Sequence, residues 1–235
     1  MYHIDIDSIP KWEDIQALPL EELVEDVNDE YTQMLNMLKA SLPILQPGEI
    51  LIPRKKLILR AFQRPEHVKV ILLGQDPYPN NLASGLAFSY DGPIEHKGPG
   101  VSMHNIAKEV YRSRGEVMPV SLSANLSHWT DQGVMLVNAA LTTVQGTSGA
   151  HQDNWSMPVA RSMFYYTTAN PKIVFVAFGR KAEQVLKKAN IPKRNRLFAY
   201  HPASWSSKFT MIGSDIFLKV NELLDEPIDW RLNSL

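Results

Sequence analysis

Residues 68–81 read VKVILLGQDPYPNN, and they join a short apolar run to a polar turn. The run at 68–73 is rich in β-branched residues and leucine, which is typical of a strand buried on both faces. It ends at Gly74, and Gln75, Asp76 and Tyr78 follow on a turn whose backbone is restricted by a proline on each side of the tyrosine. An amide, a carboxylate and a phenol this close together predict a turn that serves a ligand rather than packing alone.

Similar apolar runs predict further strands at 134–137, 173–178 and 196–200. Helices are expected at 20–42, 53–62, 102–114, 155–168, 180–189 and 214–224, with Ser102 as an N-cap and a proline opening the segment at 53. Strands that alternate with helices favour an α/β fold in which a mainly parallel four-stranded sheet carries helices on both faces. No linker-like segment interrupts this pattern, so residues 1–235 are expected to form a single domain.

The composition is that of an ordinary globular protein, with 44% hydrophobic and 21% charged residues. No cysteine is present, which excludes disulfides, thiolate catalysis and thiolate metal sites. The first residues show no signal-peptide pattern and no run is long enough to cross a membrane, so we expect a protein that is not secreted. It would act in the cytoplasm, or in a host cell or nucleus for a viral or eukaryotic source.

The formal net charge is −1, which argues weakly against a strongly basic nucleic-acid binder. Basic residues do gather at 54–56 and between 181 and 196. Solvated helix faces would explain both groups, but a local basic surface would also serve nucleic-acid binding.

A polar or turn-forming residue follows each predicted strand. Asp76 follows the first, Asn138 ends the second, and Gly179 and His201 follow the third and fourth. Each has a plain structural explanation when taken singly, as a turn residue or a strand cap. Ligands of open parallel sheets bind outside the carboxyl ends of the strands, so the joint occurrence predicts a site there.

The chain lacks the glycine motifs of dinucleotide and phosphate-binding loops, the zinc-helix motif and the serine nucleophile elbow. Its histidines show no metal-ligand spacing, so we expect no cofactor and no metal. What remains is a carboxylate, an imidazole, an amide and aromatic rings. This set suits hydrolysis through an oxocarbenium-like transition state with water as the nucleophile.

The order of these motifs resembles family-1 uracil-DNA glycosylase, the base-excision enzyme that removes uracil from DNA. The segment GQDPY at 74–78 matches the water-activating loop, and GLAFS at 85–89 matches the segment with the stacking phenylalanine. The recognition strand is matched by MLVN at 135–138 with LT at 141–142, and loops that grip DNA are matched by Gly179 and by HP at 201–202. Weaker matches are WEDI at 12–15 and PIDW at 227–230, so the similarity spans nearly the whole chain.

The resemblance implies a role for each group in the chemistry. Asp76 would position the water and stabilise the cationic sugar, and His201 would donate a hydrogen bond to uracil O2 as a neutral imidazole. His151 lies near the place of a family histidine by the water site, although its distance in sequence from Trp155 is unusual.

The same resemblance implies how the base is recognised after it has been flipped out of the helix. Phe88 would stack on the ring, and the amide of Asn138 would pair with uracil O4 and N3–H. Tyr78 would lie against C5 and reject the methyl group of thymine by collision. Gln75 would shape the pocket.

Several positions depart from the family. Pro79 stands where a histidine is usual, and GVS at 100–102 replaces Pro-Pro-Ser, which leaves Ser102 as a phosphate contact. Arg180 replaces the serine after Gly179; it would contact phosphate at longer reach, or it is simply an exposed residue at a helix start.

The intercalation loop changes most, because it reads HPASWS at 201–206 in place of His-Pro-Ser-Pro-Leu-Ser. The leucine wedge becomes Trp205, which would enter the base stack or else pack on the surface. Ala203 takes the place of a phosphate-gripping serine, so Ser204 or Ser206 would take over that contact.

Three functions remain open at this point. The first is a monomeric repair enzyme that acts on uracil in single- or double-stranded DNA, without a membrane, and that a uracil-mimicking protein could inhibit. The second is a glycosylase-fold accessory subunit, for example of a DNA polymerase, with secondary or lost catalysis. The third keeps the fold but acts on other damaged bases. Retention of the whole set of reacting and recognition residues favours the first.

Overall fold

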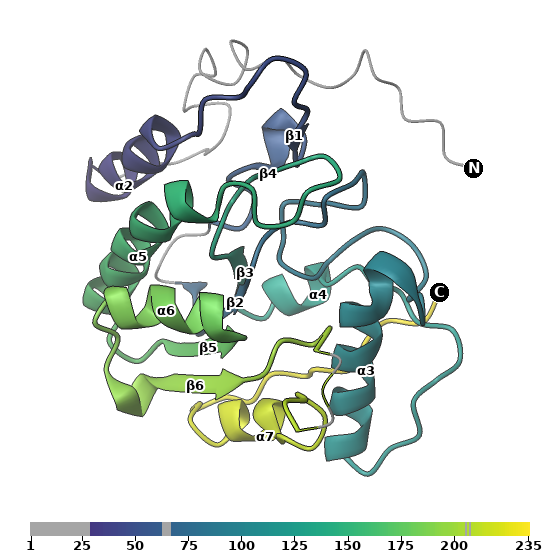
Figure 1. Cartoon of the computed structure of the whole chain (residues 1–235). Coiled ribbons are helices and arrows are strands. Elements are labelled where there is room, and N and C mark those ends of the chain that lie inside the picture. Colours follow the sequence, from purple (N-terminus) through teal and green to yellow (C-terminus); the bar gives the residue numbers. More distant parts are fainter. Residues whose placement is uncertain (1–28, 63–66, 205, 207) are drawn as a thin grey trace.

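The computed structural model describes residues 29–62, 67–204, 206 and 208–235 (Figure 1). Its centre is a four-stranded parallel sheet in the order β3-β2-β5-β6. The strands are β2 (Val70–Gly74), β3 (Val134–Asn138), β5 (Val174–Phe178) and β6 (Arg196–Ala199). Every residue of β2, β3 and β5 is buried, which explains why these strands are apolar on both faces. The predicted α/β fold with a parallel sheet is confirmed.

Helices flank the sheet in two groups (Figure 1). One group contains α5 (Gln152–Ala169) and α6 (Arg180–Lys188), which contact each other, and α2 (Asp29–Ala40), which packs on α5. The other contains α3 (Val101–Ser113), α4 (Ser127–Thr130) and α7 (Ile216–Asn221), with contacts between α3 and α7. A small antiparallel pair, β1 (Leu51–Ile52) and β4 (Thr143–Val144), was not predicted. Short 3-10 turns occupy Lys55–Leu57, Gly98–Gly100 and Lys193–Asn195.

Two local predictions were wrong. The segment 53–62 is not a helix, because it forms only the 3-10 turn Lys55–Leu57 and successive turns. These turns present the carbonyl of Leu57 and the guanidinium of Arg60 to the turn at 84–85, a packing that overrides local helix preference. Ser102 is not an N-cap either, because α3 begins one residue earlier and no side chain caps it. The predicted helix at 214–224 is shorter in the structure, where it is α7. The predicted helix at 20–42 is described only from residue 29 onward. Its first part and the WEDI segment at 12–15 lie outside the described residues.

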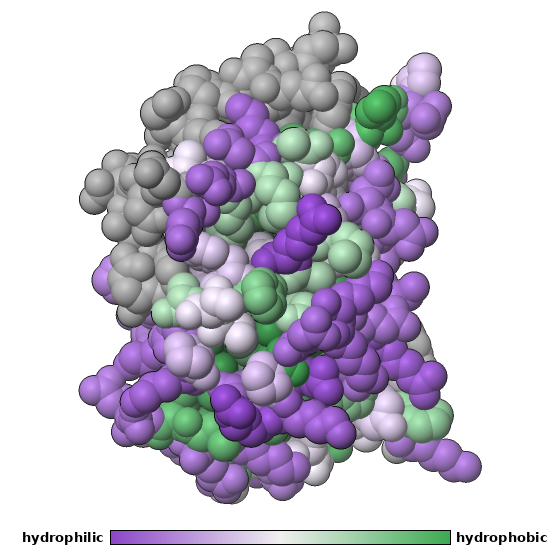
Figure 2. All heavy atoms as spheres, turned by 90° about the vertical axis from the view of Figure 1, so that its left-hand side faces the viewer, coloured by the Kyte–Doolittle hydropathy of each residue, from purple (hydrophilic) through white to green (hydrophobic). Residues whose placement is uncertain are grey.

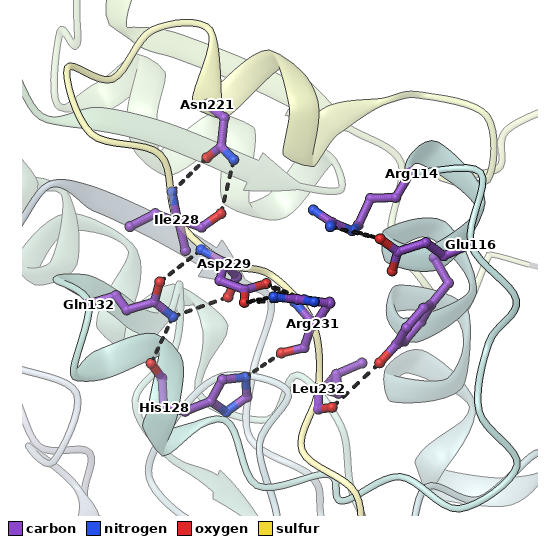
Figure 3. Close-up of polar contacts among 10 residues, drawn as sticks. Arg114, Glu116, His128, Gln132, Asn221, Ile228, Asp229, Arg231 and Leu232 are labelled. Atoms are coloured by element: carbon purple, nitrogen blue, oxygen red, sulfur yellow. Dashed lines mark hydrogen bonds and ion pairs between the residues drawn. The ribbon is translucent and has the colours of Figure 1, made fainter.

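The C-terminal segment closes the core as an extended strap, residues 225–235 (Figure 3). The side-chain amide of Asn221 both donates to and accepts from the backbone of Ile228. Gln132 makes the same paired contact with the backbone of Asp229. Directly after these anchors Trp230 is buried edge-on against Trp129, with ring centroids 5.0 Å apart. Alternate residues of the strap, Ile228, Trp230 and Leu232, therefore belong to the core, while the residues between them are exposed.

The side of the molecule that carries α2, α5 and α6 is mostly hydrophilic, with smaller apolar areas between the charged groups (Figure 2). Part of the basic group at 181–196 is already paired there, since Lys187 contacts Glu183 and Lys188 donates to Ser156. In the described ranges, no helix is long and apolar enough to cross a membrane.

Candidate active site

A cavity of about 260 Å³ opens at the carboxyl end of the sheet. Its walls come from the turn after β2, the end of β3, residues 83–88, the start of α3 and the turn after β6. The predicted site residues that line it are Gln75, Asp76, Tyr78, Phe88, Ser102, Asn138 and His201. Residues from distant parts of the chain therefore meet where the strand-end pattern placed them.

The carboxylate of Asp76 is held from one side. Its Oδ2 accepts hydrogen bonds from the hydroxyl of Ser148 at 2.7 Å and from the backbone N–H of Gly149 at 2.6 Å. Among the described residues nothing donates to Oδ1, so this oxygen remains available to a water molecule. The sequence reasoning did not identify Ser148 or Gly149. A glycine-bounded polar stretch, GTSG at 146–149, was the available signal.

Asn138 reaches the cavity because its neighbour on β2 is a glycine. Gly74 pairs with Asn138 in the parallel register, and a Cβ on Gly74 would lie 2.4 Å from the Asn138 Oδ1. The same Cβ would lie 3.2 Å from the ring of Phe88. The side chain of Asn138 is buried, with 7% exposed, and it makes no hydrogen bond within the described residues. Its amide is thus a buried donor and acceptor without a protein partner.

Phe88 and Tyr78 are linked by a hydrogen bond to the backbone, while their rings pack against different partners. Phe88 adopts a left-handed backbone, with φ of 65°, which is unusual for a bulky residue and indicates a constrained position. Its ring packs edge-on against Phe178 at 5.4 Å. The Tyr78 hydroxyl donates to the Phe88 carbonyl at 3.0 Å, and the Tyr78 ring stands perpendicular to Tyr90. Burial raises the pKa of Tyr78, so this phenol stays neutral.

His201 is fixed as a hydrogen-bond donor toward the cavity. The backbone N–H of Ala203 donates to its Nδ1 at 3.2 Å, so in the neutral ring the proton is on Nε2. Burial lowers the pKa of His201, against the opposing effect of Asp76, and this favours the neutral form. The Asn105 amide donates to the Pro202 carbonyl at 2.7 Å and ties this turn to α3.

His151 does not line the cavity. The indole N–H of Trp155 donates to the Thr142 hydroxyl at 2.7 Å, and that hydroxyl lies 3.0 Å from Nδ1 of His151. Burial lowers the pKa of His151. Since Gly149 is its near neighbour in sequence, His151 braces the loop that holds Asp76.

The other predicted DNA contacts that the structure describes do not line the cavity. Gly179 precedes α6 with φ of 90°, and Arg180 is exposed on the first turn of that helix. Ser204 donates its backbone N–H to the His201 carbonyl at 2.9 Å, and the Ser206 hydroxyl accepts from a backbone N–H. Trp205, the predicted wedge, lies outside the described residues. No cluster of three or more potential ligands for a metal ion occurs in the part of the chain that the structure covers.

The sequence model of the Uracil DNA glycosylase superfamily matches residues 62–225. The chain belongs to this superfamily. A uracil-DNA glycosylase from Mycolicibacterium vanbaalenii is 35% identical over 231 residues, covering 92% of this chain and 99% of that relative. One from Mycoplasmopsis pulmonis is 34% identical over 193 residues, covering 79% of this chain and 85% of that relative. The resemblance that the motifs indicated is confirmed.

Solved structures support the same fold. The crystal structure of mimivirus uracil-DNA glycosylase superposes with a TM-score of 0.73 at 23% identity, covering 99% of this chain and 95% of that one. The wild-type UNG structure from Nitratifractor salsuginis gives a TM-score of 0.55 at 21% identity, covering 95% and 99% of the two chains.

Proposed function

We propose that this chain hydrolyses the N-glycosidic bond of uracil in DNA, releases free uracil and leaves an abasic site in base-excision repair. Membership of the superfamily and close relatives named uracil-DNA glycosylase support the reaction. The observation that carries the assignment to residues is the convergence of Asp76, Asn138 and His201 on one cavity. A base cannot be reached while it is stacked in the duplex, so the nucleotide must rotate out of the helix to enter the cavity.

Asn138 selects the base. Its buried amide has no partner among the described residues and offers one acceptor and one donor in a plane. Uracil satisfies both through N3–H and O4, whereas cytosine presents the opposite pair and would leave two buried groups unpaired. A site built on hydrogen bonds rejects such a mismatch strongly, because unpaired buried polar groups are costly.

Tyr78 and Phe88 complete the recognition. Phe88 stacks on the ring, and Tyr78 is held rigidly beside it by the hydrogen bond to the Phe88 carbonyl. A fixed phenol at C5 leaves no room for the methyl group of thymine. Gln75 lies on the same turn and shapes the pocket wall.

Asp76 and His201 act on the two charges that develop as the bond breaks. The sugar becomes cationic, and Asp76 stabilises it while its free Oδ1 orients the attacking water. The leaving uracil becomes anionic at O2, and the Nε2–H of His201 donates to that oxygen. Because His201 accepts from Ala203 at Nδ1, it serves as a neutral donor and not as a general acid.

Contacts with the DNA strand come from the rim of the cavity. Ser102, Gly179, Arg180, Ser204 and Ser206 would hold phosphates. Trp205 would occupy the space that the flipped nucleotide leaves, as an apolar wedge in the base stack. Phosphate contacts set the register of the strand, while the cavity reads the base.

Finer features of the protein are also part of this proposal. Residues 1–235 act as one glycosylase domain and as a monomer, in the compartment that holds the DNA. A uracil-mimicking protein inhibitor would bind the same rim. A structure of a mimivirus UNG variant in complex with UGI, with a TM-score of 0.67, makes this inhibitor the natural probe.

The test is uracil release from single- and double-stranded oligonucleotides that carry one U, T or damaged base. Asp76→Asn and His201→Leu should each lower the rate by at least about 100-fold with unchanged melting temperature. The matched control is Asp225→Asn, which removes an exposed carboxylate paired with Lys172 and remote from the cavity lining. Wild-type rates in both site variants would refute the roles given to Asp76 and His201. No uracil release by the wild-type chain would refute the enzyme assignment, and DNA or partner binding by that chain would then support an accessory subunit.

A further inference from the structure

Three aromatic residues pack in a row beside the active-site loop, with their rings edge-on or tilted to one another, and we call Phe198, Tyr200 and Phe209 the aromatic shelf. The rings of Phe198 and Tyr200 have centroids 5.3 Å apart, and those of Tyr200 and Phe209 are 5.2 Å apart. Phe198 is 38% exposed and Phe209 is 46% exposed. Exposed phenylalanines that gather in this way indicate a binding surface more than a solvated one.

The shelf is continuous with the cavity through the chain itself. Tyr200 directly precedes His201, and two tight turns bring the loop back to its starting point: Ser204 N–H donates to the His201 carbonyl, and Phe209 N–H donates to the Ser206 carbonyl at 3.1 Å. Phe209 thereby returns to contact Tyr200. The shelf is the base of the loop whose first residue faces the leaving base.

The outer edge of the sheet carries no further strand here within the described residues, although α7 packs against β6. β6 is the edge strand, and within the described residues only β5 pairs with it. The burial of β6 differs from that of the inner strands, because Phe198 is exposed while every residue of β5 is buried. An aromatic side chain on an open strand face is available to a ligand.

A cation precedes the last residue of the shelf in the sequence. Lys208 is exposed, and its ammonium has no ion-pair partner in the part of the chain that the structure describes. Aromatic rings next to free cations are the arrangement that binds single-stranded nucleic acid, because bases stack on the rings while cations contact phosphates. A stacking surface also supplies affinity without positive charge, which suits a chain with a formal net charge of −1.

We propose that the aromatic shelf binds unpaired bases of the substrate strand next to the target nucleotide. This inference rests on the proposed function. It extends the DNA interface from the phosphate contacts at the rim to base stacking along β6. It also predicts that the chain favours single-stranded or locally opened DNA, since bases in an intact duplex cannot reach the rings.

The experiment compares Phe209→Ala and Phe198→Ala with the control Phe164→Ala, which removes another exposed phenylalanine, on α5. The KM for a long single strand with one deoxyuridine should rise about tenfold in each shelf variant, from the usual stacking strength of a base on an aromatic ring. The kcat, and the KM for a trinucleotide too short to reach the shelf, should stay unchanged. A loss of kcat, or an equal loss on the trinucleotide, would show that the rings only brace the loop and would overturn the proposal.

Two further variants separate stacking from simple apolar contact. Phe209→Trp should keep the wild-type KM because indole offers a larger stacking face, whereas Phe209→Leu should behave like the alanine variant. Leucine with full affinity would overturn the proposal. Lys208→Gln should lower the salt dependence of binding, with a slope smaller by about 0.7 for one phosphate contact to a single strand, while Phe209→Ala should leave the slope unchanged.

Binding of a uracil-free single strand, measured by fluorescence anisotropy, needs no turnover. It therefore separates the two proposals. A wild-type chain that releases no uracil, but binds this strand in a way that depends on Phe209, would sink the proposed function and support the shelf. Uracil release together with strand binding that Phe209→Ala leaves unchanged would support the proposed function and overturn the proposal for the shelf.

Discussion

Gly74→Ala tests whether the end of β2 is shaped for the amide of Asn138. The new Cβ would lie 2.4 Å from the Asn138 Oδ1, and real Cβ atoms essentially never approach closer than 3.0 Å. The amide must therefore shift by at least about 0.6 Å from its position in the wild-type site. Gly74 has no left-handed backbone that would itself oppose alanine, so the clash is the dominant effect.

A displacement of this size acts on a hydrogen-bonding group inside the site. Misplacement by about 1 Å lowers enzymatic rates by about 100-fold, which corresponds to about 2.7 kcal/mol. We expect a loss of kcat/KM for uracil release of roughly 30- to 100-fold. Crowding in the core should also lower the free energy of unfolding by about 1–3 kcal/mol, so the melting temperature must be measured with the rate.

A double-mutant cycle identifies the clashing partner. In the Asn138→Ala background the Oδ1 is gone, and the remaining contacts of the new Cβ are 3.2 Å to Phe88 and 3.3 Å to Ala87, which small shifts relieve. Adding Gly74→Ala there should lower the residual rate by no more than about twofold. A full additional loss in that background, or a wild-type rate in Gly74→Ala alone, would refute the reasoning that Gly74 exists to admit Asn138.

Four further outcomes follow from the site and the core. Ser148→Ala should lower kcat for a uracil oligonucleotide about tenfold with little change in KM. The reason is that Asp76 loses one charged hydrogen bond but keeps the one from the backbone N–H of Gly149. The lowered pKa of His201 means that the imidazole stays neutral until the pH falls below its usual value of about 6.5, so kcat should be level from pH 8 down to about 6.5 and decline only below it; a decline that begins above pH 7 would contradict this. Tyr78→Ala should allow release of thymine, measured beside uracil on matched strands. Trp230→Ala should cost about 3–5 kcal/mol of stability in denaturant unfolding, since the indole is buried against Trp129.

The sheet could be predicted because its strands carry their own signature. Inner strands such as 70–74 and 174–178 are buried on both faces, so an unbroken apolar run is the only sequence that suits them. The site followed from the same pattern, because the residue after each run lies at the same edge of the sheet. Boundaries shifted by a residue or two, as at Val70 and Ile216, where irregular backbone takes the place of the expected first residues.

What could not be predicted depends on contacts between distant segments. The donors to Asp76 lie on a loop after β4. The GTSG stretch at 146–149 marks a polar turn, but it does not indicate that the Ser148 hydroxyl meets a carboxylate on the turn after β2. The segment 53–62 was misread for the same reason, because its carbonyls serve the turn at Gly85, where a Cβ would lie 2.1 Å from the Leu57 oxygen. Local preference for helix or turn does not show which distant segment a backbone group will contact.

Pro79 shows how a departure from the family is accommodated. The family carries a histidine side chain there, but the structure uses only the backbone: the Pro79 carbonyl accepts the Gly146 N–H at 2.7 Å. That bond joins the turn carrying Asp76 to the loop that supplies Ser148 and Gly149, so both sides of the carboxylate's environment are fixed to each other. Proline keeps its carbonyl and restricts the turn, and the N–H that it lacks takes no part in this bond. Pro79 therefore preserves the setting of Asp76, and any functional change from the lost histidine should be found in DNA binding and not in the chemical step.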